Sequence, residues 1–473
     1  MLLTLAFRHL MVKPGRSLFL LLGYSLGVGV MIVLLSVGEA MLDQARDVSL
    51  VGGGEITVLP EGIDVEALRT GGVSGMFFTI DRARFVARQA LGGPRESGLI
   101  AAVSPSLESK LIYIRKDGET VAVRAGGEIP GRARAVGAGL TVLHGRWEDD
   151  AADSAYVSPS AQQLYDEIDH FHLPEVPDSS WGEWHYFNII AAPNEWWYVS
   201  LLVGGQVPAG KWGGQVLVTH RRPDGHYERF SEDNPATRIS FDTTRANLAI
   251  GNSRVDQTEG SYRLVVQTGD ISIDLTIEPR AHHYFPPVQL KEGPYPSGYA
   301  VAALRAEASG RLCSRGKCEE VRNARAYHDH NWGVWRDVTW EWGAASGHSL
   351  SFLYGEVRTP GASESQEPFF FSLVDSLGIR QVLRGREITY RGSQPTAGGE
   401  GVSAPATFEF IAGRNRDSVR VTVQVHEAVA TRMGTSTLQR HFLQMRGSFV
   451  LSGMIAGQVV NERGDGFFET FTK

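Results

Sequence analysis

The run YHDHNWG at residues 327–333 gathers a phenol, two imidazoles, a carboxylate, a carboxamide and an indole in one short stretch. Sequence of β type lies on both sides of this run, so we expect it to end a strand. Successive side chains of a strand point to opposite faces. The two predicted groups are Tyr327, Asp329 and Asn331 on one face, and His328, His330 and Trp332 on the other.

Asp329 is the candidate proton donor of the run. A carboxyl group in an aromatic, water-poor cavity without a neighbouring cation tends to stay protonated, as a general acid must. Tyr327 and Asn331 are predicted to hold it in place. Glu195 is a second candidate acid, although a lone glutamate at the start of a strand is usually solvated. We expect a reacting water to be oriented by His328, His330 or Glu195.

The two histidines also permit two other interpretations. His328 and His330 on one strand face supply half of a metal site, but a stable site needs further ligands and supporting partners. The predicted chemistry requires no cofactor and no motif signals one, so the sequence predicts no metal and no cofactor. In the other interpretation the run is structural, and its polar groups satisfy one another in a buried region.

Aromatic side chains are the candidates for substrate binding. Tryptophan mostly fills cores, so packing is the simpler interpretation for any one of them. Together, aromatic faces stabilise a positive charge without capturing it. A cavity lined by them suits a carbocation formed by protonating an isoprenoid double bond. The candidates are Trp184, Trp196, Trp197, Tyr198 and Trp332.

Three motifs resemble those of the AttH and carotenoid 1,2-hydratase (hydroxyneurosporene synthase) family. They are NEWWYV at 194–199, YHDHNWG at 327–333 and GDGFFETF at 464–471, in the order that the family shows. The resemblance extends over residues 156–473 and implies two lipocalin-like barrels with YHDHNWG near their junction. It also implies cofactor-free hydration of a terminal double bond in an isoprenoid or polyene, although the family includes cyclases and Diels–Alderases.

Alternation of apolar and polar residues predicts the strands of this part of the chain. The segments 271–277 and 419–425 both alternate with a period of two, which is typical of half-buried strands. Many such strands over residues 180–473 indicate a mainly β fold with two antiparallel barrels or sandwiches. Cys313 and Cys318 flank a predicted hairpin loop, so we expect a disulfide in an oxidising compartment.

The N-terminal part of the chain predicts a membrane anchor. Residues 17–38 contain no charge, and about 20 apolar residues suffice to span a bilayer as a helix. Basic residues precede this stretch and acidic ones follow it, which keeps the N-terminus in the cytoplasm. A cleaved signal peptide is the rival interpretation, but no convincing cleavage site follows Leu35. We therefore expect a single-pass protein of the inner membrane with periplasmic C-terminal domains.

The segments MLLTLAFRHL at 1–10 and GGEITVLP at 53–60 resemble the start of MacB/FtsX-type ABC-transporter permeases. This resemblance implies a small α+β fragment of a periplasmic core domain, and a permease or ATPase as partner. Permeases of this type carry three further membrane helices, whereas no second apolar stretch here is long enough to span. The predicted parts are 1–16 cytoplasmic, 17–38 transmembrane, 39–155 core fragment, 156–335 first barrel and 336–473 second barrel, with the junction before the barrels within 145–180.

Composition narrows the classes of partner. The net charge of −7 is spread without a basic stripe, which argues against nucleic acid. Hydrophobic residues at 42% and charged residues at 21% are ordinary for globular domains. The expected partners are an apolar isoprenoid or lipid and the membrane itself. The competing class to an enzyme is a periplasmic lipid- or lipoprotein-binding module that works with an ABC transporter.

Overall fold

The computed structural model describes residues 14–46, 98–116, 119–136 and 169–472, together with a few single residues between 83 and 95. Within the last range, residues 175, 208, 291–295, 361–366, 400 and 434–439 are excepted. The chain forms two compact units, Met1–Gly92 with Glu96–Val157, and Gly93–Arg95 with Ser158–Lys473. The motifs at 1–10 and 53–60, and most of the predicted core fragment 39–155, lie outside the described residues.

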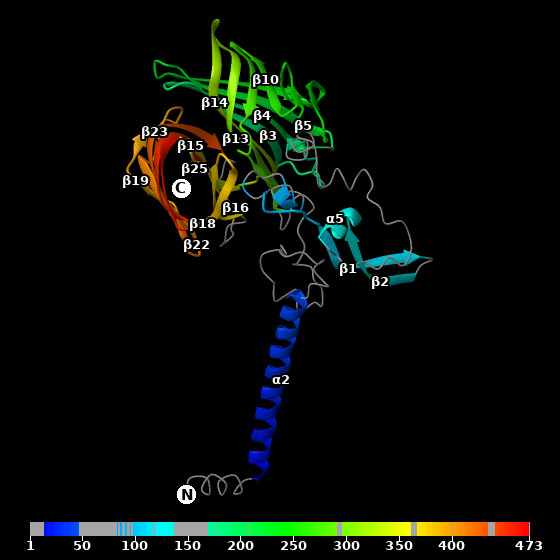
Figure 1. The fold of residues 1–473 in the computed structure, drawn as a ribbon. Coiled ribbons are helices and arrows are strands. Elements are labelled where there is room, and N and C mark those ends of the chain that lie inside the picture. The colour runs from blue at the N-terminus through cyan, green and yellow to red at the C-terminus, as the bar shows by residue number, and fades with distance from the viewer. Residues whose placement is uncertain are drawn as a thin grey trace. The chain divides into compact units, whose positions relative to one another are not determined.

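The first unit contains a long apolar helix, α2 (Pro14–Arg46), drawn in blue in Figure 1. Its segment Pro14–Gly38 is long and apolar enough to cross a membrane, and the expected span 17–38 lies inside it. An N-terminal signal sequence passes the same test of length and composition. A separate hairpin of β1 (Ser106–Lys116) and β2 (Glu119–Glu128) precedes the short α5 (Pro130–Ala135).

The second unit begins with a 12-stranded antiparallel sheet, coloured green in Figure 1. Its strands run in the order β6-β5-β4-β3-β14-β13-β11-β10-β9-β8-β7, and β12 pairs with β13. The bounds are β3 (Trp181–Ala192), β4 (Glu195–Gln206), β5 (Lys211–Arg221), β6 (Tyr227–Pro235), β7 (Ile239–Phe241), β8 (Leu248–Ile250), β9 (Ser253–Thr258), β10 (Ser261–Thr268), β11 (Ile271–Pro279), β12 (Phe285–Leu290), β13 (Ser297–Ser314) and β14 (Lys317–Val334), with the 3-10 turn η1 (Ala236–Arg238).

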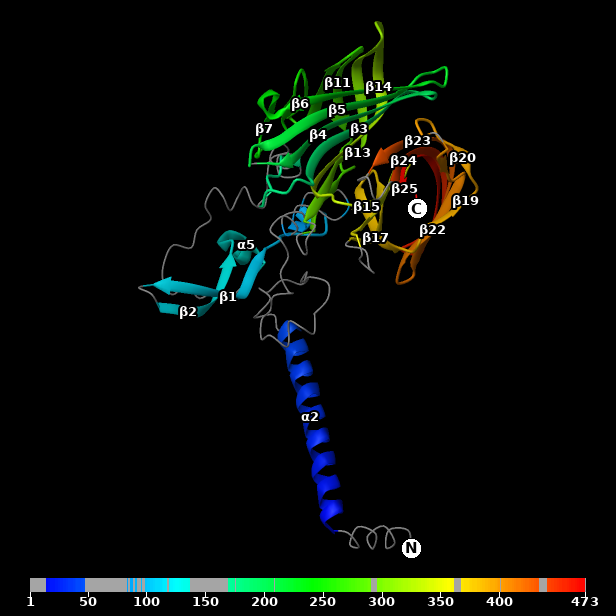
Figure 2. The same cartoon turned by 180° about the vertical axis from the view of Figure 1, so that it is seen from behind.

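The rest of the second unit is a closed barrel, seen nearly along its axis in Figure 2. Its strands run in the order β18-β17-β16-β15-β25-β24-β23-β22-β19, and the pairing of β18 with β22 closes the ring. A two-stranded sheet of β20 and β21 accompanies it. The bounds are β15 (Thr339–Gly347), β16 (Ser351–Arg358), β17 (Glu367–Asp375), β18 (Gly378–Gly385), β19 (Thr389–Arg391), β20 (Gln394–Pro395), β21 (Ser403–Ala404), β22 (Thr407–Arg414), β23 (Asp417–Met433), β24 (Arg440–Ile455) and β25 (Gln458–Phe471).

Alternation in the sequence explains why these segments are strands. In β23 the valines from Val419 to Val425 are buried, whereas Arg420, Thr422 and Gln424 between them are exposed. Strand β11 alternates in the same way, and its isoleucines are buried on the inner face of the first sheet. The mainly β fold expected from the sequence is therefore confirmed. The predicted disulfide is also present, because Cys313 of β13 and Cys318 of β14 stand directly opposite each other.

Candidate active site at the junction of the two sheets

Strand β14 positions the YHDHNWG run between β13 and β3, and Asp329 pairs with Tyr186 of β3. The two expected faces are confirmed by the contacts of the side chains. Tyr327 and Asp329 face aromatic residues of the closed barrel, in a cluster that includes Trp342 and Phe370. The histidines of the run point to the interior of the first sheet.

Asp329 is a buried carboxyl group held by two donors of its own strand. The Tyr327 hydroxyl donates to its Oδ2 at 2.7 Å, and the Asn331 amide donates to its Oδ1 at 2.8 Å. Trp342 of β15 donates its indole N–H to the Tyr327 oxygen at 3.0 Å, so the tyrosine proton is directed to Asp329. Burial raises the pKa of Asp329 to about 6, and the two hydrogen bonds oppose this rise.

A second carboxyl group, Glu469 of β25, lies on the same side, and sequence reasoning did not select it. The Trp340 indole N–H donates to its Oε2 at 3.0 Å, and Gln444 donates to the Tyr186 hydroxyl at 2.7 Å. Burial, and next the negative charge of Asp329, raise the pKa of Glu469 to about 8. Its place in the GDGFFETF motif was the available signal, but the motif alone did not reveal which residues it would face.

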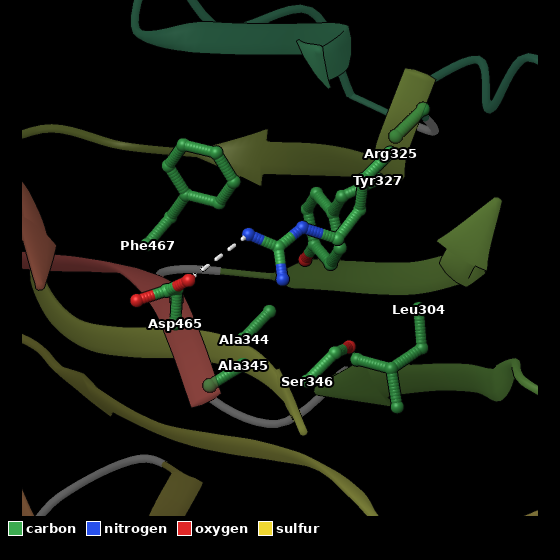
Figure 3. A pocket seen from close by; sticks show the side chains of 10 residues that line it. Leu304, Arg325, Tyr327, Ala344, Ala345, Ser346, Asp465 and Phe467 are labelled. Atoms are coloured by element: carbon green, nitrogen blue, oxygen red, sulfur yellow. Dashed lines mark ion pairs between the residues drawn. The ribbon is translucent and has the colours of Figure 1, made fainter. Parts of the chain in front are cut away.

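A small cavity lies beside these groups, between β13 and β14 of the first sheet and β15 and β25 of the barrel (Figure 3). Its volume is about 20 Å³, which is enough for a water molecule. Arg325 and Asp465 face each other across it as an ion pair at 3.6 Å, and Tyr327 forms part of its wall. The cavity therefore offers space for a small molecule such as water beside Tyr327.

The predicted aromatic residues separate into two groups. Trp184, Trp196 and Tyr198 lie on the Asp329 side of the sheet. The ring of Tyr198 packs edge to face against Phe467 of the barrel, with 5.3 Å between the ring centroids. Trp184 instead packs on Trp335 and Trp340. The remaining two lie apart from this group, because Trp197 stacks on His220 and Trp332 stacks on His172, both at 3.6 Å.

His328 and His330 do not face Asp329 and are engaged elsewhere. Nε2 of His328 lies 3.0 Å from Asp169 Oδ2, and its Nδ1 lies 3.1 Å from the Tyr186 carbonyl oxygen. His330 lies between two carboxylates, with Asp169 at 2.8 Å and Glu183 at 2.7 Å. The expectation that these histidines orient a water for Asp329 does not fit this placement. Two groups of side chains here are spaced closely enough to bind a metal ion. One is Asp169 with His185 and His330, and the other is His172 with Glu183 and His330.

Glu195 also lies away from Asp329. Asp329 pairs with Tyr186, which pairs with Ser200, and from Ser200 to Glu195 strand β4 rises about 17 Å. The Glu195 carboxylate contacts the His220 ring at 2.8 Å, next to Glu228. Burial raises the pKa of Glu195, and the positive charge of Arg222 opposes this rise. A role as second acid beside Asp329 is not supported by this position.

Comparison with known proteins gives a likeness of low identity. No family model matches the chain, and no curated protein matches it. An AttH-like protein of Nitrosomonas europaea is 13% identical with a TM-score of 0.45, over 62% of this chain and 92% of that one. Kievitone hydratase of Nectria haematococca is 14% identical with a TM-score of 0.44, over 64% and 97%. CghA with Sch210972 is 12% identical with a TM-score of 0.43, over 66% and 96%.

Proposed function

We propose that this chain is a membrane-anchored hydro-lyase that adds water to a terminal C=C bond of an apolar isoprenoid or polyene, in the manner of a carotenoid 1,2-hydratase. The observation that carries the proposal is the place of Asp329. This residue is 3% exposed, its carboxyl group is oriented by Tyr327 and Asn331, and it faces the aromatic layer between the two sheets. The sequence motifs shared with carotenoid 1,2-hydratases support the same reaction.

The proposed hydration has two steps, protonation of the alkene by Asp329 and addition of water to the cation. Asp329 gives its proton to the less substituted carbon of the alkene, and the tertiary cation rests against the rings of Tyr186, Tyr327 and Trp342. Water bonds to the cation, and the proton that it releases returns to the Asp329 carboxylate. The product is a tertiary alcohol, and the acid is regenerated. Glu469 takes the place that the sequence assigned to Glu195, as the second carboxyl group near the reacting atoms.

The size of the cavity beside Tyr327 limits how a substrate could use it. The cavity has room for a water but not for an isoprenoid, because ligand pockets usually measure about 300 Å³ or more. A substrate that reaches Asp329 through this cavity has to displace the side chains that line it. An anchor in the inner membrane, with the barrels in the periplasm, would keep the protein beside the phase in which such substrates dissolve.

The test uses the full chain in detergent with acyclic carotenoids that end in a trisubstituted double bond. We expect a product heavier by one water, labelled by ¹⁸O from the solvent, and a loss of about 100-fold or more in Asp329→Asn. The matched control is Asp274→Asn, a half-buried carboxylate paired with Arg263 in the same sheet. Equal rates in the wild type and Asp329→Asn would contradict the proposed acid.

Two alternative functions use the same site. A non-catalytic lipid- or lipoprotein-binding module that partners an ABC-transporter permease or ATPase agrees with the permease-like N-terminal motifs. The chain would then co-purify with an unchanged lipid. A terpenoid cyclase or pericyclic catalyst would use the same aromatic layer, and its product would have the mass of the substrate.

A further inference from the structure

The histidine face of β14 contains a buried cluster that the proposed hydration does not use. Asp169 precedes β3, His185 lies on β3 and His330 on β14, and these side chains are 0–1% exposed. The rings of His185 and His330 stack at 4.0 Å between centroids. Three separate segments therefore bring one carboxylate and two imidazoles together inside the first sheet.

The three groups converge in the way that ligands of one ion do. Asp169 Oδ1 lies 2.8 Å from His330 Nδ1 and 3.8 Å from His185 Nδ1. None of these three atoms has a hydrogen-bond partner among the described residues. His185 Nδ1 is too far from the oxygen, and at His330 the N–H direction misses the oxygen despite the short distance. Two ligands of a tetrahedral ion with bonds of about 2 Å lie about 3.3 Å apart, between the two measured distances.

The two buried carboxylates of the cluster need a positive charge nearby to balance them. Asp169 and Glu183 are both fully buried, and their ion-pair partners in the described part of the chain are histidines, with no lysine or arginine among them. A divalent ion with neutral histidines balances two carboxylates. The competing solution is a protonated His330 between the two acids, without a metal.

The outer contacts resemble the supports of metal ligands. Glu183 Oε1 lies 2.7 Å from Nε2 of His330, on the side away from Asp169, although Nε2 makes no hydrogen bond to it in this geometry. His328 Nε2 lies 3.0 Å from Asp169 Oδ2 and supports that carboxylate. Carboxylates beside the outer nitrogen of a metal-bound histidine fix its orientation and raise its basicity. The other ligand group is less suitable, because Glu183 already accepts the backbone N–H of His172.

We propose that Asp169, His185 and His330 bind one divalent transition-metal ion, Zn²⁺ by preference. Two imidazoles and one carboxylate are a ligand set that zinc and related first-row ions accept. The ion ties the segment around Asp169 to β3 and β14. It lies on the opposite face from Asp329, so its role is to hold β14 in position and not to act on a substrate.

The test is a metal titration of the full chain in detergent after dialysis against a chelator. We expect one equivalent of Zn²⁺ by elemental analysis, a higher melting temperature with Zn²⁺, and a histidine-type ligand-field spectrum with Co²⁺. His185→Gln and Asp169→Asn should each lose about 10-fold or more in affinity. The matched control His220→Gln removes a buried histidine that also contacts carboxylates, and it should keep the full equivalent.

Two results would overturn the proposal. One is a wild-type chain that retains no Zn²⁺ beyond the control for detergent alone, which would favour the protonated histidine. The other is unchanged affinity in both His185→Gln and Asp169→Asn, with circular dichroism showing that they are folded. If those variants do not fold, the wild-type stoichiometry and Co²⁺ spectrum decide, since a site without imidazole ligands gives no histidine-type spectrum.

Discussion

The Tyr327 hydroxyl links the two sheets through a single hydrogen-bonded chain. It accepts from Trp342 of the barrel and donates to Asp329 of its own strand. Removing it leaves a buried indole N–H and one carboxyl oxygen without a partner, and such a loss costs about 1–3 kcal/mol. We expect Tyr327→Phe to lower the free energy of unfolding by this amount, as measured by urea denaturation.

Tyr354 provides the matched control for that variant. It is equally buried, but its hydroxyl has no hydrogen-bond partner among the described residues. Tyr354→Phe should therefore leave the stability unchanged or raise it, because it removes an unsatisfied polar atom. Equal losses in the two variants would show that the Tyr327 hydroxyl contributes no more than packing.

The raised pKa of Glu469 predicts that the stability of the chain falls as the pH rises, which is the opposite of the usual behaviour of a carboxyl group. Its pKa is raised from 4.5 to about 8, so the folded chain keeps a proton that the unfolded chain gives up. The stability that this group contributes is present below pH 4.5 and is lost as the pH rises through 8. Glu469→Gln should be more stable than wild type above pH 8, by about 1 kcal/mol or more, and equal to it near pH 4.

Urea denaturation at several pH values measures this difference. Glu409→Gln is the control, because Glu409 is a surface partner of Arg391 and Arg420 and such ion pairs contribute little. Parallel stability curves for the wild type and Glu469→Gln would contradict the raised pKa.

The sequence predicted the faces of the YHDHNWG run because a strand has a strict period of two. It did not predict Glu469 or Trp342 as neighbours of Asp329. These residues belong to the other sheet, and only the packing of one sheet on the other brings them to Asp329. It also did not predict Asp169 as a neighbour of His330, since Asp169 precedes the first strand of its sheet.

At the scale of elements, the turn between β15 and β16 depends on one carboxylate from β25. Glu462 accepts the backbone N–H groups of Ser349 and Leu350 at 2.9 Å each, and the Ser349 hydroxyl at 2.6 Å. These hydrogen bonds lower the pKa of Glu462 to about 2, although its burial alone would raise it. The turn and the end of β25 are therefore joined by a group that must be ionised.

This contact predicts an acid-sensitive element. A lowered carboxyl pKa contributes stability above pH 4.5 that is lost as the pH falls through about 2. Glu462→Gln should be less stable than wild type at pH 7, by about 1–3 kcal/mol, and the difference should disappear near pH 2. Denaturation curves of the two proteins from pH 7 to pH 2 measure it. A constant difference over that range would mean that the substitution removes packing and not a charge.

The alternation of apolar and polar residues made the strands predictable, whereas the pairings that close the barrel could not be predicted. Segments such as β11 and β23 show their buried faces in the sequence. The pairing of β18 with β22, which closes the barrel, and the pairing of β14 with β3 join strands that are distant in the chain. Such pairings depend on the register and twist of the whole sheet, which one sequence does not reveal.

At the scale of the whole molecule, helix α2 bears on where the proposed reaction would take place. Its segment Pro14–Gly38 is apolar enough to span a bilayer, and all of its apolar side chains whose surroundings are described are exposed. A retained anchor would tether the chain to the bilayer, in which apolar substrates dissolve. A cleaved signal sequence would release the rest of the chain, and the proposed substrate would then have to be carried to it.

Membrane fractionation and intact mass measurement distinguish these two fates of α2. We expect the expressed chain to remain in the membrane pellet after high-salt and alkaline washes, with the mass of an uncleaved N-terminus, because a spanning helix is held by the hydrophobic effect and not by charge. A variant with Leu21→Arg and Val30→Arg serves as control, since two charges in the span oppose insertion and should leave the chain outside the membrane pellet. A soluble wild-type protein shortened after α2 would instead establish a signal sequence and remove the membrane anchor from the proposed function.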